Sequence, residues 1–489
     1  YRVTAASSRE RLEAGGADLW DSGQVASDRC FDVEYDGKLL HSGQRVWWRV
    51  QVWDGAARAS APSEATWFEM GLLAPSDWQA QWLDIEDPEE RDDRAAGIHW
   101  IWSQAAALAA GAQQFRYRLE LPRAALEAEL LLAAKDDLLG VWIDGKAVPL
   151  PAPTKIFWGT MLRVPLPCAA GTHVIALQAK ADSGGFMPGT GGAVAALVKV
   201  REPGGGIRRL TTGEGWRASD SAPPGWQELD FDDRSWPQAR AAPMAPPCDP
   251  RPPRAALWAH REFNIPKLLE RARLYATALG AYEIHINGRR LGTARLAPEI
   301  SVATDHVLYQ CHDATPLLKQ GSNGRAASIG DGWYASAFSW ENERFALGDS
   351  PRRFLAQLVL DYSDGSREVI ATDASWRLGP SAIRSSEIYN GEDYDARRED
   401  GEWGQPGQDD PHSGWRPASI GSAPPARLVA QIDPPIRALQ SLAPRKLTQP
   451  RSGVFVFDFG QNFAGWCRLR VKGPAGTVVR LRHAEILLQ

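Results

Sequence analysis

Two segments of this chain repeat one another, and a repeat of this length constrains the architecture more than any single motif does. The first copy reads FRYRLELPRAALEAELLLAAKDDLLGVWIDGKAV (Phe115 to Val148), and the second reads HREFNIPKLLERARLYATALGAYEIHINGRRLG (His260 to Gly292). Each copy has a proline near the end of a strand, then an alternating apolar strand, and then Ile-Asp-Gly or Ile-Asn-Gly, which favours a tight hairpin. We therefore expect two sandwiches of one jelly-roll, galactose-binding-like type, each of about 175 residues.

The segment before the repeats has the pattern of a smaller sandwich. In RVWWRVQVWD (Arg45 to Asp54), Val46 and Trp48 alternate with Trp47 and Trp53, which is the period of a strand with one buried face. Glycine and serine turns at regular spacing favour a fibronectin-III-like domain. Trp47 and Trp53 then lie on the opposite face, where packing in the core or at a domain interface is the expected role and sugar stacking is the alternative.

The length and the composition favour a row of β domains. A chain of 489 residues exceeds what one hydrophobic core organises, and its 45 Gly, 35 Pro and 21 Trp are typical of sandwiches joined by many turns. A proline-rich stretch near 241–256 reads as a stiff linker. The expected class is all-β with low helix content, in four parts: a fibronectin-III-like domain at 1–73, a first jelly roll at 74–254, a second at 255–428, and the start of a further β-sandwich at 429–489.

Charge and cysteine usage exclude several classes of function. The formal net charge is −5 and the basic residues are scattered, so no stripe for phosphate backbones is present and nucleic acid is not an expected partner. The five cysteines are isolated and indicate neither a metal knuckle nor a disulfide framework. The sequence contains no apolar run of about 18 residues, so it predicts no membrane-spanning helix. It starts at Tyr1, without Met and without the pattern of a signal peptide, which indicates a fragment and assigns no compartment.

Four later motifs occur in an order that resembles the bacterial α-L-rhamnosidases of the inverting glycoside hydrolase class. They are GAYEIHINGRRLG, IGDGWY (Ile329 to Tyr334), YNGEDYDAR (Tyr389 to Arg397) and FDFGQNFAGWCRLRVKGPAG (Phe457 to Gly476). The resemblance implies hydrolysis of terminal α-L-rhamnosyl groups of glycosides or polysaccharides. It also implies an (α/α)6 catalytic barrel after these sandwiches, which would be the partner of this segment and would carry the acid and base carboxylates.

Because no helical barrel is encoded here, no residue of this chain is assigned a catalytic role. Glu485 fits a solvent-facing strand position. Glu392, Asp393 and Asp395 fit a hydrogen-bonded turn better than a cation site or a brace for the barrel. The remaining candidates are expected to pack within their own sandwiches: the loop Asp331-Gly332-Trp333-Tyr334, the strand Phe457-Asp458-Phe459, and Trp466 as a core aromatic.

One pair of acids distinguishes the two copies. Where the first copy has Lys135-Asp136-Asp137, the second has Ala278-Leu279-Gly280 on the register that the shared hairpin fixes. Adjacent carboxylates repel one another unless a cation or strong donors compensate them. A fold that needed acids here would show them twice, so the pair indicates a function of the first copy.

The first copy resembles the calcium-dependent rhamnose-binding module found in some members of this family. That resemblance implies that Asp136 and Asp137 take the places of an acid and its amide neighbour, that Asp182 takes the place of a later Asn, and that Met187 or Pro188 lies near the loop carbonyl. Trp158 takes the place of the tryptophan that packs on the sugar. Asp in place of the amides departs from the module's pattern and adds negative charge. The alternative is that the acids are solvated turns and Trp158 is a core residue.

The expected function is therefore that of the front part of an α-L-rhamnosidase, with this segment as scaffold and as a calcium-dependent rhamnose-binding arm. Two alternatives come from other classes of protein. One is a complete, non-catalytic carbohydrate-binding protein, and the other is a structural array of sandwiches. The encoding sequence after Gln489 discriminates them, since a helical repeat with paired acids is expected only for the enzyme.

Overall fold

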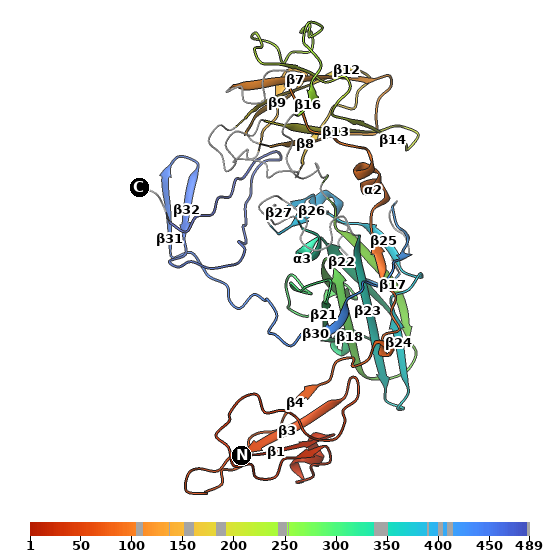
Figure 1. Cartoon of the computed structure of the whole chain (residues 1–489), viewed down its shortest axis with the longest axis vertical. Helices are drawn as coiled ribbons and strands as arrows, with labels where there is room; N and C mark the ends of the chain where they lie inside the picture. The colour runs from red at the N-terminus through yellow and green to blue at the C-terminus, as the bar shows by residue number, and fades with distance from the viewer. Residues whose placement is uncertain are drawn as a thin grey trace. The chain divides into compact units, whose positions relative to one another are not determined.

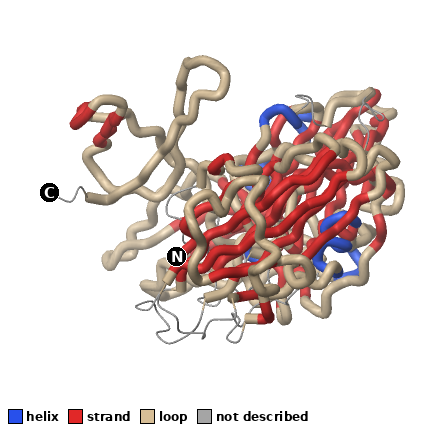
Figure 2. Tube along the Cα trace, turned by 90° about the horizontal axis from the view of Figure 1, so that it is seen from above, coloured by secondary structure: helices blue, strands red, loops and turns tan. Residues whose placement is uncertain are grey.

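The computed structural model describes residues 1–103, 111–135, 137–150, 161–181, 192–242, 252, 254–336, 351–388, 391–399, 404–407 and 414–486. Of these residues 42% are in strands and 6% in helices, which confirms the all-β class (Figure 2). The chain forms two compact units, Tyr1–Gly292 with Leu296–Asp433, and Thr293–Arg295 with Pro434–Gln489. No helix in the described part is long and apolar enough to cross a membrane.

The first domain is built on one four-stranded sheet. Its order is β2-β1-β3-β4, with bounds Trp20–Asp21, Arg2–Ala6, Arg45–Gln51 and Thr66–Glu69, and α1 (Arg9–Glu13) follows β1. Val46 is fully buried, and Trp48 packs on the same small core. Trp47 lies opposite Trp67 on the neighbouring strand, with ring centroids 6.5 Å apart. This tryptophan therefore packs within its own domain, on the face opposite Val46 as predicted.

The first jelly roll consists of two sheets that enclose one apolar core. Phe115 and Leu177 from one sheet meet Leu132 and Val198 from the other, and all four are fully buried. The first sheet has the order β10-β9-β12-β7-β15, with bounds Lys146–Ala147, Asp137–Ile143, Gly171–Lys180, Ala112–Leu121 and Arg217–Ser219. The second has the order β11-β8-β13-β6-β16, with β14 beside β13, and bounds Leu162–Pro165, Glu127–Ala134, Val194–Arg201, Ile101–Trp102, Arg240–Ala241 and, for β14, Ile207–Thr211.

The second jelly roll repeats this topology strand for strand (Figure 1). One sheet is β20-β19-β22-β17-β25-β28, with bounds Arg289–Arg290, Ala281–Ile286, Gly321–Gly330, Leu257–Ile265, Arg377–Pro380 and Arg416–Pro417. The other is β29-β5-β23-β18-β21-β30, with β24 beside β23, and bounds Ser419–Ile420, Leu83–Ile85, Arg352–Tyr362, Leu269–Leu279, His306–Asp313, Arg427–Ala430 and, for β24, Arg367–Ala371. Apart from the extra strands β28 and β30, each strand has a counterpart with the same neighbours in the first copy.

The tight hairpins that the two copies share in their sequences have the predicted geometry. Asp144 and Asn287 both have a φ of 49°, and the glycines that follow, Gly145 and Gly288, have φ of 77° and 75°. Two successive residues with positive φ match the twist of a two-residue hairpin and explain the Asp-Gly and Asn-Gly pairs. The two copies also share a tryptophan directly before the equivalent strands β15 and β25: Trp216 and Trp376 are both fully buried.

The first jelly roll is inserted between two strands of the second. Strand β5 pairs with β23, with Leu83 opposite Phe354, whereas the next strand of the second jelly roll along the chain is β17. Residues 83–85 lie in the range 74–254 that the sequence assigned to the first jelly roll, so the structure differs from the prediction here. Three residues between loops carry no local signal for the sheet they join, because the pairing partner is about 270 residues away.

Short elements complete the first unit. Helix α2 lies in the connection from β5 into the first jelly roll, and α3 carries the GWY part of the IGDGWY motif. The bounds of these elements are Pro88–Ala95 for α2, Gly332–Ala335 for α3, Ile383–Glu387 for β26, Gly391–Tyr394 for β27, and Pro75–Asp77, Thr315–Leu317 and Ala396–Arg398 for the 3-10 helices η1, η2 and η3.

The second unit contains one hairpin, β31 (Lys446–Arg451) with β32 (Val454–Asp458). The alternating pattern after it predicted further strands, but the described residues 459–486 form none. Trp466, which was expected in a core, is 61% exposed. A strand forms only where a neighbour supplies its hydrogen bonds, and within this unit's described residues no neighbour lies alongside.

A buried carboxyl lies where the chain enters and leaves the inserted domain. Glu90 on α2 accepts a hydrogen bond from the backbone N–H of Ala255, and its carboxylate lies 3.5 Å from the guanidinium of Arg352 on β23. Burial raises the pKa of Glu90 to about 7, although Arg352 and Arg254 favour the charged form. The folded protein therefore holds a proton on Glu90 at pH values where an unfolded chain has lost it.

This proton predicts a pH-dependent effect of Glu90→Gln. Because the pKa is raised on folding, the stability that the protonated group gives is complete below pH of about 4.5 and is lost as pH rises through about 7. The neutral amide keeps the shape without that loss. Between pH 5 and pH 8, the free energy of unfolding of the variant, measured with urea, should rise relative to that of the unmodified protein by up to about 3 kcal/mol. A difference that does not change with pH would contradict the buried proton.

Candidate functional site

The predicted calcium and sugar site belongs to one end of the first jelly roll, where four loops leave the two sheets. Lys180 lies opposite Asp137 on β9 and opposite Ala112 on β7, and Val194 lies opposite Ala134 on β8 and Ile101 on β6. The ends of β6, β8 and β12 and the starts of β7, β9 and β13 therefore meet. The start of β11 lies close by, because Leu162 faces Leu132 near the end of β8. We call this end the loop end.

Three of the four predicted site residues, Asp136, Trp158 and Asp182, lie outside the described residues. Their described neighbours along the chain, Lys135, Met161 and Ala181, are all at the loop end or within a few residues of it. The fourth, Asp137, is the first residue of β9, is half-buried and faces Lys180 across the strand pair. The topology thus brings together the strand ends that border all of the predicted ligands.

A buried lysine precedes these acids. Lys135 is only 5% exposed, and its backbone N–H donates to the carbonyl of Ala193 across the loop end. A buried ammonium next to carboxylates neutralises charge that a calcium ion would otherwise neutralise. Among the described residues, no three His, Cys, Asp or Glu side chains lie close enough together to hold a metal. The described part of the loop end therefore holds one acid of the predicted set, Asp137.

The loop end also contains buried polar atoms that the sequence reasoning missed. Gln113 is 1% exposed, and its Oε1 has no hydrogen-bond partner among the described residues; the buried Ser103 Oγ and Trp102 Nε1 nearby likewise have none there. All three belong to the end of β6 or the start of β7. Their signal was present in the sequence, since Gln113 occupies a position that alternates with Phe115 and Leu119 on the apolar face of β7.

Two of the other acids that the sequence singled out, Asp395 and Asp458, have partners close by in the chain. Asp395 accepts from the backbone N–H of Arg397 and pairs with its side chain at 2.8 Å, which confirms the hydrogen-bonded turn. Asp458 Oδ1 accepts from the N–H of Gly460 in the same way. Asp393 lies 3.9 Å from Arg163 of the first jelly roll, so it faces the other domain. Glu485 lies in a described segment without strand.

The IGDGWY loop packs on its own sandwich, as expected. Tyr334 is buried with Leu279 and Leu355 in an apolar cluster of the second jelly roll. Beside it lies a shallow, open pocket, whose lining includes Trp333, Glu299 and Ser301. The turn of this pocket has Ala278-Leu279-Gly280 where the first copy has its acids. The second copy therefore lacks the carboxylates of the predicted calcium site.

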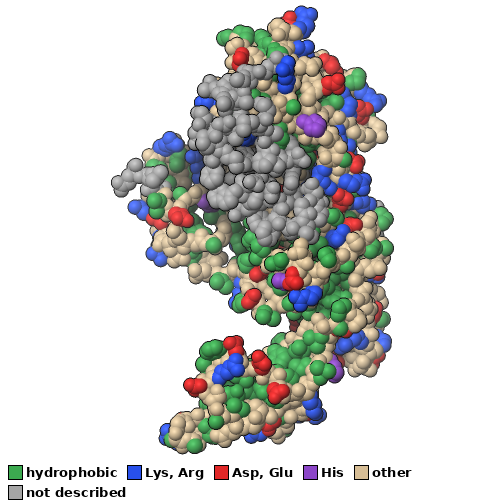
Figure 3. All heavy atoms as spheres, viewed as in Figure 1, with side chains coloured by type: hydrophobic (Ala, Val, Ile, Leu, Met, Phe, Trp, Pro, Cys, Tyr) green, Lys and Arg blue, Asp and Glu red, His purple; other side chains and the backbone are tan. Residues whose placement is uncertain are grey.

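The charges on the surface are mixed. On the face drawn in Figure 3, lysine and arginine side chains alternate with aspartate and glutamate. A mixed surface of this kind gives no extended field of one sign that would attract a polyanion or a polycation.

Family models match three segments of the chain. Residues 1–74 match the Rha78A-like N-terminal immunoglobulin domain, and residues 267–440 match the α-L-rhamnosidase N-terminal domain. Residues 448–489 match the concanavalin-like domain of bacterial α-L-rhamnosidases. The three matches follow the order in which the sequence places its β domains.

Full-length relatives extend this similarity to the whole chain. An α-L-rhamnosidase of Streptomyces avermitilis is 38% identical over 503 residues, which cover 100% of this chain and 48% of that protein. An α-L-rhamnosidase of Formosa agariphila is 24% identical over 492 residues, 37% of its length. The chain thus spans about half, or less, of the length of these curated relatives, and it matches their amino-terminal part.

Solved structures agree with the sequence comparison. The crystal structure of Streptomyces avermitilis α-L-rhamnosidase complexed with L-rhamnose superposes with a TM-score of 0.75 and 33% identity, over 94% of this chain and 45% of that one. An α-L-rhamnosidase structure from Dictyoglumus thermophilum has a TM-score of 0.55 at 22% identity, over 95% of this chain and 34% of that one. The second match supports the fold alone.

The unpartnered Gln113 oxygen predicts the effect of a substitution. Gln113→Leu replaces a buried carbonyl oxygen without a partner by apolar atoms of similar volume, so it should raise the free energy of unfolding by about 1–3 kcal/mol. Chemical denaturation measures the change, with Leu139→Ala, at an exposed position of β9, as the neutral control. A loss of stability in Gln113→Leu would mean that this oxygen has a partner in solution.

Proposed function

This chain belongs to the bacterial α-L-rhamnosidase family, and we propose that the protein of which it forms the amino-terminal part hydrolyses terminal α-L-rhamnosyl residues with inversion. The observation that carries the proposal is the 38% identity to the Streptomyces avermitilis enzyme over the entire chain. The ordered matches to three rhamnosidase domain models support it. The substrate class would be rhamnose-containing glycosides or polysaccharides.

The catalytic carboxylates of this reaction would lie outside residues 1–489. An inverting mechanism needs an acid and a base about 6.5–9.5 Å apart, on opposite sides of the scissile bond, with room for a water molecule. Asp93, Asp395 and Asp458 are instead paired with arginine or lysine or cap local turns. Their role is structural, and the domains would act as scaffold for the reaction.

The first jelly roll would bind rhamnose through calcium at the loop end. Asp136, Asp137 and Asp182 would supply oxygen ligands, and calcium, which takes six to eight oxygens, would leave positions for two sugar hydroxyls. Trp158 would give an apolar face to the C–H side of the sugar. Two observations favour this placement: the strand ends that border these residues meet, and the second copy has Ala278-Leu279-Gly280 where the first has Lys135-Asp136-Asp137.

The first test concerns turnover. Purified residues 1–489 should release no chromophore from a nitrophenyl α-L-rhamnoside, because the acid and the base would be supplied from elsewhere in the protein. The same assay on the Streptomyces avermitilis relative serves as the positive control. Turnover that copurifies with this chain through every step would place the catalytic carboxylates inside it.

The second test concerns the metal and the sugar. In calorimetric titrations of residues 1–489, L-rhamnose should bind only when calcium is present, and Asp136→Ala should abolish both, because it removes a charge and a ligand oxygen together. Trp158→Ala should weaken the sugar by about 1–2 kcal/mol and leave calcium binding intact.

A matched control and a clear contrary result are available for this titration. Asp232→Ala removes an acid of the same jelly roll that is exposed and pairs only locally with Arg234, so it should bind both ligands normally. Rhamnose binding that is undiminished in excess chelator would eliminate the metal. If neither ligand produces heat, the three acids are residues of solvated turns and not calcium ligands.

A further inference from the structure

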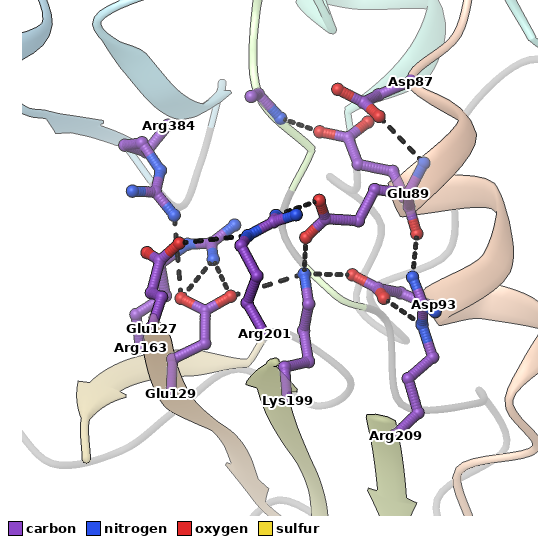
Figure 4. A network of polar contacts seen from close by, with 12 residues as sticks. Asp87, Glu89, Asp93, Glu127, Glu129, Arg163, Lys199, Arg201, Arg209 and Arg384 are labelled. Carbon is purple, nitrogen blue, oxygen red and sulfur yellow. Dashed lines mark hydrogen bonds and ion pairs between the residues drawn. The ribbon is translucent and has the colours of Figure 1, made fainter. Parts of the chain in front are cut away.

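A row of charges crosses the outer face of one sheet of the first jelly roll. Glu129 on β8 lies opposite Lys199 on β13, and Lys199 lies opposite Arg209 on β14. Arg163 on the far edge strand β11 pairs with Glu129 at 2.9 Å. Figure 4 shows these side chains pointing to the same side of the sheet. Cross-strand neighbours of opposite charge stabilise a sheet, and neighbours of like charge destabilise it.

Helix α2 supplies the charge that this row lacks. Lys199 and Arg209 are like charges on adjacent strands, and Asp93 of α2 lies between them, 2.7 Å from the lysine and 2.6 Å from the arginine. One turn earlier, Glu89 accepts from both Lys199 and Arg201 at 2.6 Å. Residues four apart share a helix face, so one face of α2 is held by four short, charge-assisted bonds.

The other side of α2 faces the second jelly roll. Glu90 contacts the N–H of Ala255 and Arg352 there, and Arg352 lies 3.3 Å from Asp331, the residue before α3. Arg254 lies at the same distance from Asp331. The connection into the inserted domain and the connection out of it are therefore joined at one buried cluster.

A second set of contacts reaches the same face of the first jelly roll from the β26–β27 hairpin of the second jelly roll and from the 3-10 helix η3 after it. Arg384 lies 3.6 Å from Glu129, Asp393 lies 3.9 Å from Arg163, and Arg398 lies 3.9 Å from Glu127. These separations are longer than the 3.4 Å between Lys199 and Glu129 within the row and the 2.6–2.7 Å of the bonds from the row to α2. The attraction between charges falls with distance and with exposure to solvent, so the hairpin contacts are the weaker set.

The ion pairs of Lys199 with Asp93 and Glu89 are buried, so removing one partner alone would be costly. Lys199 is 7% exposed, and its pKa is raised because Asp93 and Glu89 outweigh the desolvation that would lower it. The pKa of Arg384 is lowered, first by desolvation and then by the nearby Arg163 and Arg398. Glu129 attracts Arg384, whereas the neighbouring arginines repel it. Dissolved salt should therefore weaken the Arg384–Glu129 contact at a lower concentration than it weakens the short bonds to α2.

We propose that these contacts form an electrostatic latch between the two jelly rolls. The short bonds fix α2 to the first jelly roll, and the weaker ion pairs of Arg384, Asp393 and Arg398 close the latch and hold the inserted domain against the β26–β27 hairpin. When these ion pairs are lost, the inserted domain turns about its two connections while both sandwiches stay folded. The latch does not depend on the proposed sugar binding, although it would orient the domain that carries it.

The test compares variants of two arginines with a control from the same hairpin. In Arg384→Ala combined with Arg398→Ala, small-angle X-ray scattering of residues 1–489 should show a broader distribution of interdomain distances than the unmodified protein shows. Arg397→Ala is the control, because Arg397 is exposed and pairs with Asp395 of its own turn. The unmodified protein in about 1 M salt, where screening acts over about 3 Å, should broaden in the same way as the double variant.

Hydrogen exchange distinguishes a released domain from an unfolded one. The amides of β12 and β22, which form the centres of the two jelly rolls, should keep their protection in the double variant. Scattering identical to that of the unmodified protein would overturn the latch, because other contacts would then set the orientation. Loss of protection in β12 or β22 would also overturn it, because the ion pairs would then be part of the folding of a sandwich.

Discussion

The interaction on which the position of helix α2 depends is the contact between Asp93 and the pair Lys199 and Arg209 of the first jelly roll. Two cations on adjacent strands cannot remain buried side by side without an anion, and the anion comes from a helix that lies outside both sandwiches. The same helix presents Glu90 to the second jelly roll. A short connecting helix therefore supplies carboxyl groups to contacts with both jelly rolls.

Much of this architecture could be predicted because duplication leaves a record in local chemistry. The Ile-Asp-Gly and Ile-Asn-Gly turns require positive φ at two successive residues, and both turns have it. Trp216 and Trp376, which directly precede the equivalent strands β15 and β25, are both buried in the cores of their sandwiches. Patterns of this kind are local, so the sequence alone determines them.

Features that depend on distant partners were not predictable in the same way. Strand β5 joins β23 across an inserted domain, and nothing in Leu83-Asp84-Ile85 encodes that choice. Trp466 was expected in a core and is exposed in its unit, because burial depends on a neighbour that the residue's own sequence does not specify. For the candidate site, alternation identified the strands that carry it, but only the topology shows that their ends meet, and the buried Gln113 emerged from the structure.

We propose that the loop end of the first jelly roll is a calcium-dependent site for rhamnose. The most direct measurement is a crystal structure of the chain soaked with calcium and L-rhamnose, with anomalous scattering to identify the metal. The account predicts an anomalous peak beside Asp137, at the meeting point of β8, β9, β12 and β13, with two sugar hydroxyls as ligands. A loop end without metal, or with the Lys135 ammonium paired to the acids in its place, would contradict it.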